Sequence, residues 1–236
     1  MKEMRIHLTE PLKMDFDMEL NKLMLLVGHN GTGKSLVLKL NWVLSFIVCT
    51  EIEGKTHAAA LKLPVPPIKE LTQYTFDKSF DNQNFDGTVG AEFENGTCSV
   101  VLEKGKVKDV MIFTEAEEAP IPVFMSTSTR TFEDIHRFLA MEKIVGQQKV
   151  LDHYKLYDVL LIQKLKKSCE TGIPVTAKIE ARLKTFDLHT KNFESFRYDP
   201  EQNIFLAKIK DSNEINLATL SKGEQAIISM LLVTNL

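Results

Sequence analysis

Apolar and polar residues alternate along the first twenty residues of the chain. Met4, Ile6 and Leu8 are separated by polar residues, and every second position from 12 to 20 is apolar. Successive side chains of a β-strand point to opposite faces. The pattern therefore predicts two half-buried strands, each with one face against a core.

The pattern changes at residue 23. Residues 23–27, Leu-Met-Leu-Leu-Val, are continuously apolar, which is typical of a strand buried on both faces. Residues 36–49 have only Lys39, Asn41 and Ser45 as polar interruptions, so they predict a helix that is covered on most sides. We therefore expect an antiparallel flank to meet a parallel core next to residues 28–35.

Residues 54–87 predict no regular structure, because prolines at 64, 66 and 67 interrupt a helix or a strand there. Beyond them, three alternating runs separated by an Asn-Gly and a Lys-Gly turn predict a meander of three antiparallel strands. The runs cover residues 89–93, 98–102 and 107–113, and residues 122–126 predict a further core strand.

The second half of the chain predicts helices and then short strands. Thr131 with Asp134 resembles a capping box that opens a helix to about residue 145. A longer helix is expected over 147–171, closed by Gly172, and a third helix from Pro174. Short strands are expected at 193–198, 204–209 and 215–217.

Composition narrows the function classes. The chain has 236 residues and a formal net charge of −3, which argues against binding of nucleic acid by bulk positive charge. Residues 141–191 hold ten Lys and Arg against six Asp and Glu, a local charge of +4. That segment is either the solvated face of a helical lobe or a surface for phosphate backbones or a partner.

The chain carries three single cysteines with no CxxC pair, which indicates buried thiols in a reducing compartment. The N-terminus lacks the apolar segment of a signal peptide, and the apolar run at 36–49 is too short to span a bilayer. We therefore predict a cytoplasmic protein with no membrane partner.

Residues 28–35, Gly-His-Asn-Gly-Thr-Gly-Lys-Ser, match the phosphate-binding loop G-x-x-x-x-G-K-[ST] at every fixed position. In such a loop, glycines let backbone N–H groups turn toward phosphate oxygens, Lys34 reaches the β- and γ-phosphates, and Ser35 holds Mg²⁺. The alternative is a glycine-rich turn that happens to carry Lys-Ser. The predicted nucleotide-binding residues are Gly28, Asn30, Gly31, Thr32, Gly33, Lys34 and Ser35, with ATP and Mg²⁺ as cofactors.

Residues 220–225, Leu-Ser-Lys-Gly-Glu-Gln, open the last apolar helix. Ser221 supplies a hydroxyl and Gly223 permits close approach of the backbone, so this helix N-terminus is a second candidate for anion binding. Taken alone, the same residues also read as an ordinary helix cap. The pairing with residues 28–35 favours the anion-binding interpretation.

The two motifs together resemble those of the ABC-type ATPases, most closely the SMC, RecF and OLD-like AAA ATPase heads. The resemblance implies an α/β fold with a P-loop NTPase core, in which a mixed sheet with an antiparallel β flank is joined to a helical lobe. A strand like residues 123–126 and a nearby arginine, here Arg130, precede that lobe in the family. The implied segments are 1–130 for the P-loop lobe, 131–192 for the helical lobe and 193–236 for strands and the signature helix.

The resemblance also implies how such a protein assembles. Heads of this family associate head to tail in pairs, so Ser221, Gly223 and Glu224 would act in trans on the nucleotide of a second copy. The implied partners are a second copy in a homodimer or larger assembly, an effector or nuclease subunit, and DNA. The family also uses a glutamine that reports on the γ-phosphate, for which Gln73 and Gln83 are the candidates.

The chain departs from the family in one respect. After the signature helix the family continues into four apolar residues followed by Asp-Glu, and no such pair follows here. Residues 110–115 are the nearest imitation, but they precede the signature and lack the aspartate. The glutamates at 115, 117 and 118 read as a solvated loop rather than a metal site. The catalytic residues are therefore unknown, and we expect part of a longer ATPase or a split head completed by another chain.

Three functions are compatible with these observations. The first is an ATP-hydrolysing head that dimerises on ATP and serves DNA maintenance and repair or antiviral defence, inactive as the isolated chain. The second is the nucleotide-binding subunit of a transporter, although such subunits place the signature much closer to the phosphate loop. The third is a nucleotide-binding interaction module without catalysis, which the missing acidic pair favours.

Overall fold

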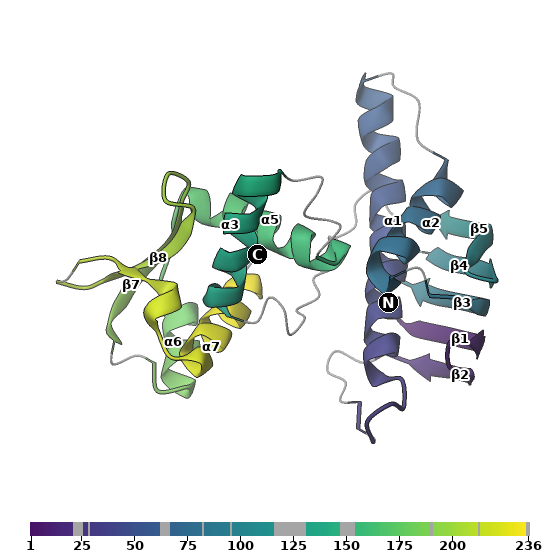
Figure 1. Ribbon diagram of the computed structural model, residues 1–236, viewed down its shortest axis with the longest axis horizontal. Helices are drawn as coiled ribbons and strands as arrows, with labels where there is room; N and C mark the ends of the chain where they lie inside the picture. The colour runs from purple at the N-terminus through teal and green to yellow at the C-terminus, as the bar shows by residue number, and fades with distance from the viewer. Residues whose placement is uncertain are drawn as a thin grey trace. The chain divides into compact units, whose positions relative to one another are not determined.

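The computed structural model describes most of the chain, and Figure 1 shows its elements. The described residues are 1–20, 26–27, 29–61, 67–81, 83–94, 96–115, 131–146, 154–188, 191–211 and 213–234, with side chains described outside 53–61 and 145. The chain divides into two compact units, Met1–Pro122 and Val123–Leu236, called unit 1 and unit 2 below.

Unit 1 contains an antiparallel five-stranded sheet in the order β2-β1-β3-β4-β5. Its strands are β1 (Glu3–Glu10), β2 (Met14–Glu19), β3 (Asp86–Phe93), β4 (Gly96–Glu103) and β5 (Lys106–Thr114). The two alternating N-terminal strands and the three-stranded meander are therefore confirmed. The sequence pattern did not indicate that β1 joins the two sets by pairing with β3.

The sheet has one buried and one exposed face. Ile6 lies opposite Val89, which lies opposite Val100, and all three side chains are fully buried. Helices α1 (Lys34–Leu61) and α2 (Ile68–Phe80) cover that face, as Figure 1 shows. Apolar side chains of α1 complete the core: Val37, Leu40, Val43, Leu44 and Ile47 are all buried.

The prediction of irregular structure over 54–87 is wrong for residues 54–61 and 68–80, and residues 62–66 lie outside the described residues. Helix α1 extends to Leu61, and α2 begins directly after Pro67. Two polar residues conceal α2 in the sequence, because its buried face contains Thr72 and Thr75. Each hydroxyl donates to a carbonyl four residues earlier in the same helix, at 2.7 and 2.8 Å, and these bonds allow the threonines to be buried.

By length and composition, one of the described helices is apolar enough to cross a membrane. The stretch is Lys34–Ile52 of α1, with a mean hydropathy of 1.6, and half of it is buried inside the protein. Core helices of soluble proteins pass the same test, and α1 supplies the core of unit 1. The cytoplasmic location stays a prediction.

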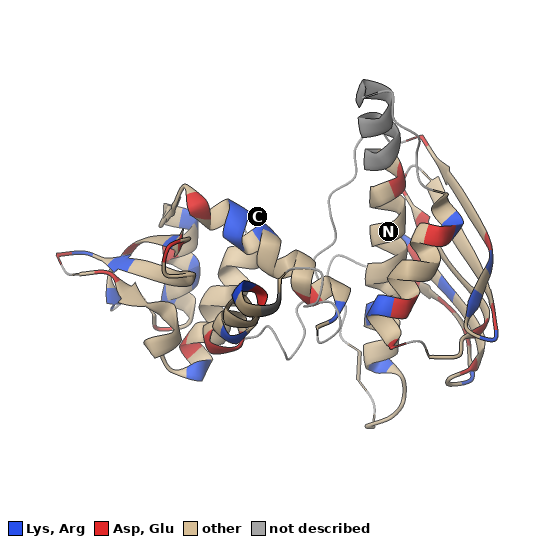
Figure 2. Cartoon of the chain, turned by 45° about the horizontal axis from the view of Figure 1, so that its top comes forward, with Lys and Arg blue, Asp and Glu red and all other residues tan. Residues whose placement is uncertain are grey.

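Unit 2 combines helices with a small antiparallel sheet, and both acidic and basic residues are spread over these helices and strands (Figure 2). Its helices are α3 (Phe132–Val145), α5 (Leu156–Glu170), α6 (Ala177–Thr185) and α7 (Lys222–Val233), and a short 3-10 helix, η3, covers Leu217–Thr219. Its sheet has the order β6-β7-β8-β9, with β6 (Ile173–Pro174), β7 (Phe193–Asp199), β8 (Ile204–Ile209) and β9 (Ile215–Asn216). The predicted segments 131–192 and 193–236 contribute to a common hydrophobic core.

The helix starts of unit 2 show where sequence signals are reliable. Thr131 accepts a hydrogen bond from the Asp134 N–H, as the capping pattern predicts. The third helix does not begin at Pro174, which pairs with Ser195 in the sheet. It begins at Ala177 because Thr176 caps it. The longer helix begins at Leu156 with Lys155 as its N-cap, so a continuous helix from residue 147 is wrong, and residues 147–153 lie outside the described residues.

The fold class is confirmed as α/β, and the strand pairings described are all antiparallel. Of the strand expected at 23–27, residues 23–25 lie outside the described residues, whereas Leu26 and Val27 are not in a strand and Val27 is 83% exposed, so burial on both faces is wrong at this end. The strand expected at 122–126 lies within residues 116–130, outside the described residues, as does Arg130. The parallel core therefore stays a prediction. The three cysteines are free and buried, as expected.

Candidate functional site

The glycine loop before α1 adopts a backbone that other residues rarely adopt. Gly31 has φ of 82° and Gly33 has φ of 86°, in the left-handed region where L-residues with a Cβ are strained. A Cβ on Gly33 would also lie 2.9 Å from Leu12 Cδ2 and 3.2 Å from Met14 Cε. Gly33 is therefore required by both backbone conformation and packing, whereas Gly31 faces open space. Gly28 lies outside the described residues.

The side chains of this loop contact the loop's own backbone. The Lys34 ammonium donates to the His29 carbonyl at 2.5 Å and lies 3.3 Å from Thr32 Oγ1. The Thr32 hydroxyl donates to the same carbonyl at 2.9 Å. Asn30 and Ser35 are exposed at this end of α1. The arrangement puts a cation, a hydroxyl and a helix N-terminus together, which is a chemistry suited to a phosphate group.

The second motif starts α7 in unit 2 with a complete capping box. The Ser221 hydroxyl accepts from the Glu224 N–H, and the Glu224 carboxylate accepts from the Ser221 N–H at 2.8 Å. Lys191 also pairs with Glu224 at 3.2 Å. The hydrogen bonds with Ser221 and the ion pair with Lys191 lower the pKa of the Glu224 carboxyl. The motif therefore does form a helix cap in the structure.

Gly223 is not explained by that cap. It is exposed within the first turn of α7, has no left-handed φ, and a Cβ there would meet no atom within 4 Å. Glycine lowers the stability of a helix relative to alanine. Nothing described within the unit thus requires glycine at position 223.

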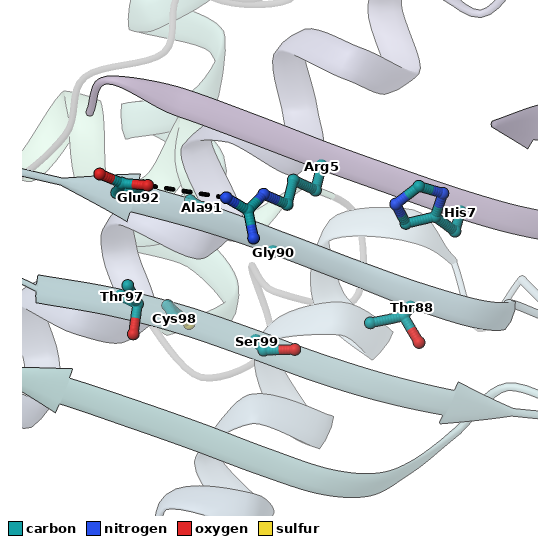
Figure 3. A pocket seen from close by; sticks show the side chains of 9 residues that line it. All are labelled: Arg5, His7, Thr88, Gly90, Ala91, Glu92, Thr97, Cys98 and Ser99. Atoms are coloured by element: carbon teal, nitrogen blue, oxygen red, sulfur yellow. Dashed lines mark ion pairs between the residues drawn. The ribbon is translucent and has the colours of Figure 1, made fainter. Parts of the chain in front are cut away.

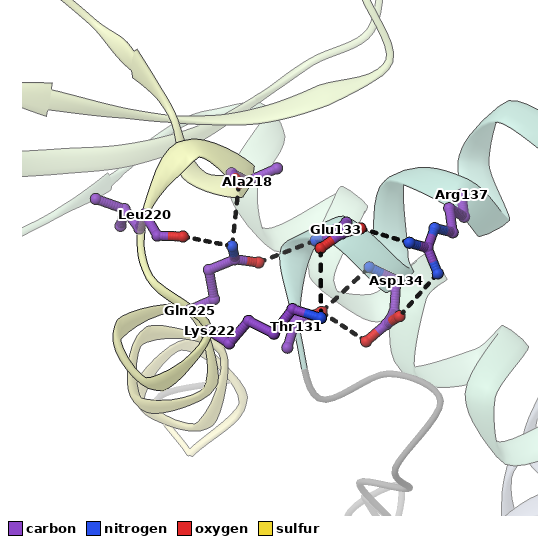
Figure 4. A network of polar contacts seen from close by, with 8 residues as sticks. All are labelled: Thr131, Glu133, Asp134, Arg137, Ala218, Leu220, Lys222 and Gln225. Carbon is purple, nitrogen blue, oxygen red and sulfur yellow. Dashed lines mark hydrogen bonds and ion pairs between the residues drawn. The ribbon is translucent and has the colours of Figure 1, made fainter.

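Gln225, the last residue of the second motif, is at the centre of the polar network in Figure 4. Its side-chain NH₂ group donates to the Ala218 carbonyl at 3.0 Å and the Leu220 carbonyl at 2.7 Å. Its side-chain oxygen accepts from the Glu133 N–H at 3.0 Å. The residue is 2% exposed. No local pattern indicates this contact, because Glu133 lies 92 positions earlier.

The structure gives the two glutamine candidates of unit 1 different surroundings. Gln73 on α2 donates to the Asp77 carboxylate and the Gly105 carbonyl, and accepts from the Val107 N–H at 2.7 Å. It therefore joins α2 to the β4–β5 turn and to β5. Gln83 is exposed just after α2.

Gln83 lines a hollow of about 170 Å³ at the start of α1. The hollow is also lined by Leu36 and Lys39 of α1, and by Ser79, Phe80 and Asp81. Of the two candidates, Gln83 is the one that reaches the first turns of the helix that follows the loop.

The described residues do not supply the acidic pair that the family uses for catalysis. Val110–Thr114 belong to β5, and Glu115 is exposed directly after it. Glutamates 117 and 118 lie outside the described residues. Within the described part of the chain, no group of three or more His, Cys, Asp or Glu is arranged to hold a metal ion. Mg²⁺ bound with a nucleotide does not need such a group, because it takes phosphate oxygens, waters and one protein ligand.

The exposed face of the unit 1 sheet carries a feature that the sequence did not reveal. A hollow of about 340 Å³ lies over Gly90 and Ser99, with Arg5 and His7 on β1 at its border (Figure 3). Arg5 pairs with Glu3 at 2.8 Å and approaches Glu92 at 3.7 Å. A hydrogen bond to Asp15 raises the pKa of His7. The cations at this hollow are therefore paired with carboxylates of the same sheet.

The comparisons with known proteins add no relative from which a function could be transferred. No protein-family model matches this chain, and no curated protein matches it at a significant level. The functional interpretation therefore rests on the two helix N-termini described above.

Proposed function

We propose that this chain is the ATP-binding part of an ABC-type head of the SMC, RecF and OLD-like group, with a P-loop NTPase core that binds Mg-ATP at residues 28–35. The supporting observation is the loop geometry. Two glycines with left-handed φ directly precede a helix whose first residue, Lys34, folds its ammonium back over the loop. In a glycine-rich turn that carries Lys-Ser by chance, nothing would require the Lys34 ammonium to lie over the loop.

The residues of the loop divide the binding of the nucleotide between them. Backbone N–H groups near Gly31 and Gly33, at the positive end of the α1 dipole, hold phosphate oxygens. The Lys34 ammonium exchanges the His29 carbonyl for the β- and γ-phosphates, a gain because the acceptor then carries a negative charge as well. The Ser35 hydroxyl, which is exposed, supplies the protein ligand to Mg²⁺.

The second motif acts, in this proposal, on the nucleotide of a second copy. The capping box does not prevent this, because a serine hydroxyl accepts and donates at the same time. Ser221 Oγ accepts from the Glu224 N–H, and its O–H, which interacts with the Glu224 carboxylate, can rotate to donate to a phosphate oxygen. Gly223 lets that phosphate approach the backbone of α7 closely, which gives the glycine a purpose.

Hydrolysis requires a carboxylate that orients the attacking water. No acidic pair of the family's kind follows the signature within these 236 residues, so none of them is assigned as that carboxylate. The complete head is proposed to be an ATPase, and the 236 residues alone are proposed to bind nucleotide without turnover. DNA maintenance or antiviral defence in the cytoplasm, with DNA and an effector or nuclease subunit as partners, follows from the resemblance alone.

A non-catalytic nucleotide-binding module is the second candidate. The missing acidic pair favours it, since binding and pairing need only the two motifs. The transporter subunit has no observation in its favour, because the signature follows the loop after an additional sheet and helical lobe. Turnover by a head completed with the missing acidic segment separates the ATPase from the binding module.

The test of nucleotide binding is a calorimetric titration of Mg-ATP into the parent chain and into Lys34→Ala. The variant should lose binding altogether, because each charge-assisted contact contributes roughly 1.5–3 kcal/mol at a site built for several negative charges. Lys39→Ala changes a lysine of the same helix outside the loop and should bind ATP as the parent does. Equal affinity of the parent and Lys34→Ala would refute the site.

A further inference from the structure

Helix α3 begins with backbone donors that its own turns cannot satisfy. The first N–H groups of an α-helix have no partner within the helix. At α3, the Asp134 N–H donates to Thr131 Oγ1 at 3.2 Å, which is a local cap. The Glu133 N–H donates instead to the side-chain oxygen of Gln225, at 3.0 Å. The start of α3 is thus completed by a residue of α7.

The other end of the Gln225 amide holds the segment before α7. Its two donors reach the carbonyl of Ala218, within η3, and the carbonyl of Leu220, which follows η3 and precedes Ser221. A second link runs alongside, because the Lys222 ammonium lies 3.9 Å from the Glu133 carboxylate. Arg137 also pairs with that carboxylate (Figure 4). The starts of α3 and α7 therefore share one set of hydrogen bonds.

We propose that Gln225 is a positioning residue, which sets Ser221 and Gly223 in place and ties them to the start of α3. The proposal rests on the proposed function for its consequence. When a nucleotide of a second copy contacts Ser221, the start of α3 is ordered together with the start of α7. Gln225 itself does not contact the nucleotide, because all three of its amide hydrogen-bonding contacts lie inside unit 2 and the residue is buried.

Unit 1 provides a matched control for this role. Gln73 makes the same kind of contact, with two donors and one acceptor that join α2 to β5 and its preceding turn. Gln73→Leu and Gln225→Leu therefore remove equivalent interactions from the two units. Only Gln225→Leu should disturb the second motif.

The first measurement is amide hydrogen exchange without nucleotide. In the parent, the Glu133 amide should be protected to the same degree as the capped Asp134 amide. In Gln225→Leu, the Glu133 amide and the first turn of α7 should exchange at least about tenfold faster, because a donor and two carbonyls lose their partner. Gln73→Leu should leave both unchanged. An unprotected Glu133 amide in the parent would overturn the proposal, and that check needs no variant to fold.

The second measurement is Mg-ATP-dependent pairing, followed by light scattering well below the unfolding temperature. Gln225→Leu should weaken pairing at least tenfold while its Mg-ATP affinity changes less than twofold, and Gln73→Leu should pair as the parent does. Equal loss of pairing in both variants would mean a general loss of stability and would overturn the role. If the parent does not pair with Mg-ATP, the proposed pairing function fails. The exchange measurement then decides separately whether Gln225 positions the motif.

Discussion

The two helices that begin with glycine-containing motifs, α1 and α7, begin in different ways. Before α1, Gly33 is required by a φ of 86° and by the packing of Leu12 and Met14. At α7, Ser221 and Glu224 form a complete cap, and Gly223 has no conformational or steric need to be glycine.

The two motifs differ in how far local structure explains their residues. The packing of the described residues does not explain why Gly31, before α1, has a left-handed backbone conformation. This conformation therefore favours a ligand at the loop. At α7, local structure explains the serine and the glutamate, so only Gly223 needs a reason from outside the unit. The proposal of nucleotide binding is therefore better supported at α1 than at α7, and substitutions of the glycines can test this difference.

The largest effect is expected from Gly33→Ala, compared with Gly31→Ala. Both substitutions place a Cβ at positive φ, which costs roughly 1–2 kcal/mol. Gly33→Ala must in addition displace the flexible ends of the Leu12 and Met14 side chains, so it should lower the free energy of unfolding by less than about 1 kcal/mol more than Gly31→Ala. Trp42, the only tryptophan, is buried in α1 and its fluorescence reports the unfolding of unit 1. Equal stability of the two variants would show that the contact with β2 carries no weight.

The next largest effect is expected from a change of pH, to which the stabilities of the two units should respond differently. Burial lowers the pKa of His136 to about 4, and its Nε2 accepts from the Phe205 N–H at 2.9 Å. The unfolded chain takes up the proton near pH 6.5, so the contribution of His136 to stability is complete above that pH and falls toward pH 4. A loss on the order of 1–2 kcal/mol is expected for unit 2, after allowance for partial exposure.

Amide exchange of α3 measured from pH 7 to pH 4.5 checks this expectation. His136→Gln keeps an acceptor for the Phe205 N–H without a titrating group, so its exchange should show no such pH dependence beyond the intrinsic one. His7 in unit 1 is shifted the other way, since its hydrogen bond to Asp15 raises its pKa. A loss of stability in acid confined to unit 1 would contradict the assignment to His136.

The smallest effect on stability is expected from Gly223→Ala. Alanine is the better helix former by about 0.5–1 kcal/mol, and the added Cβ meets open space, so unit 2 should keep or slightly raise its unfolding temperature. The same variant should pair less well in the presence of Mg-ATP, because the methyl group keeps the phosphate away from the backbone. A destabilised Gly223→Ala would mean that the helix itself requires glycine, and the comparison between α1 and α7 would lose its basis.

Local chemistry in the sequence was sufficient for much of the molecule. Strict alternation gave the strands of unit 1, because a period of two allows one buried face. Thr131 and Ser221 marked helix starts, since a cap is made within four residues. The motif at residues 28–35 predicted the loop before α1. In each case the interacting residues are neighbours in the chain, so the pattern contains the interaction.

Features that depend on residues far apart in the chain became visible only in the folded structure. Helix α2 was missed because Thr72 and Thr75 read as polar, and only burial of that face shows their hydroxyls bonded back to the helix. From the sequence alone it was possible to predict a glycine loop that matches the phosphate-binding pattern, and a capped helix that begins with Ser221 and Gly223. Only the tertiary structure joined the start of α3 to Gln225, because that hydrogen bond spans 92 positions and leaves no local pattern.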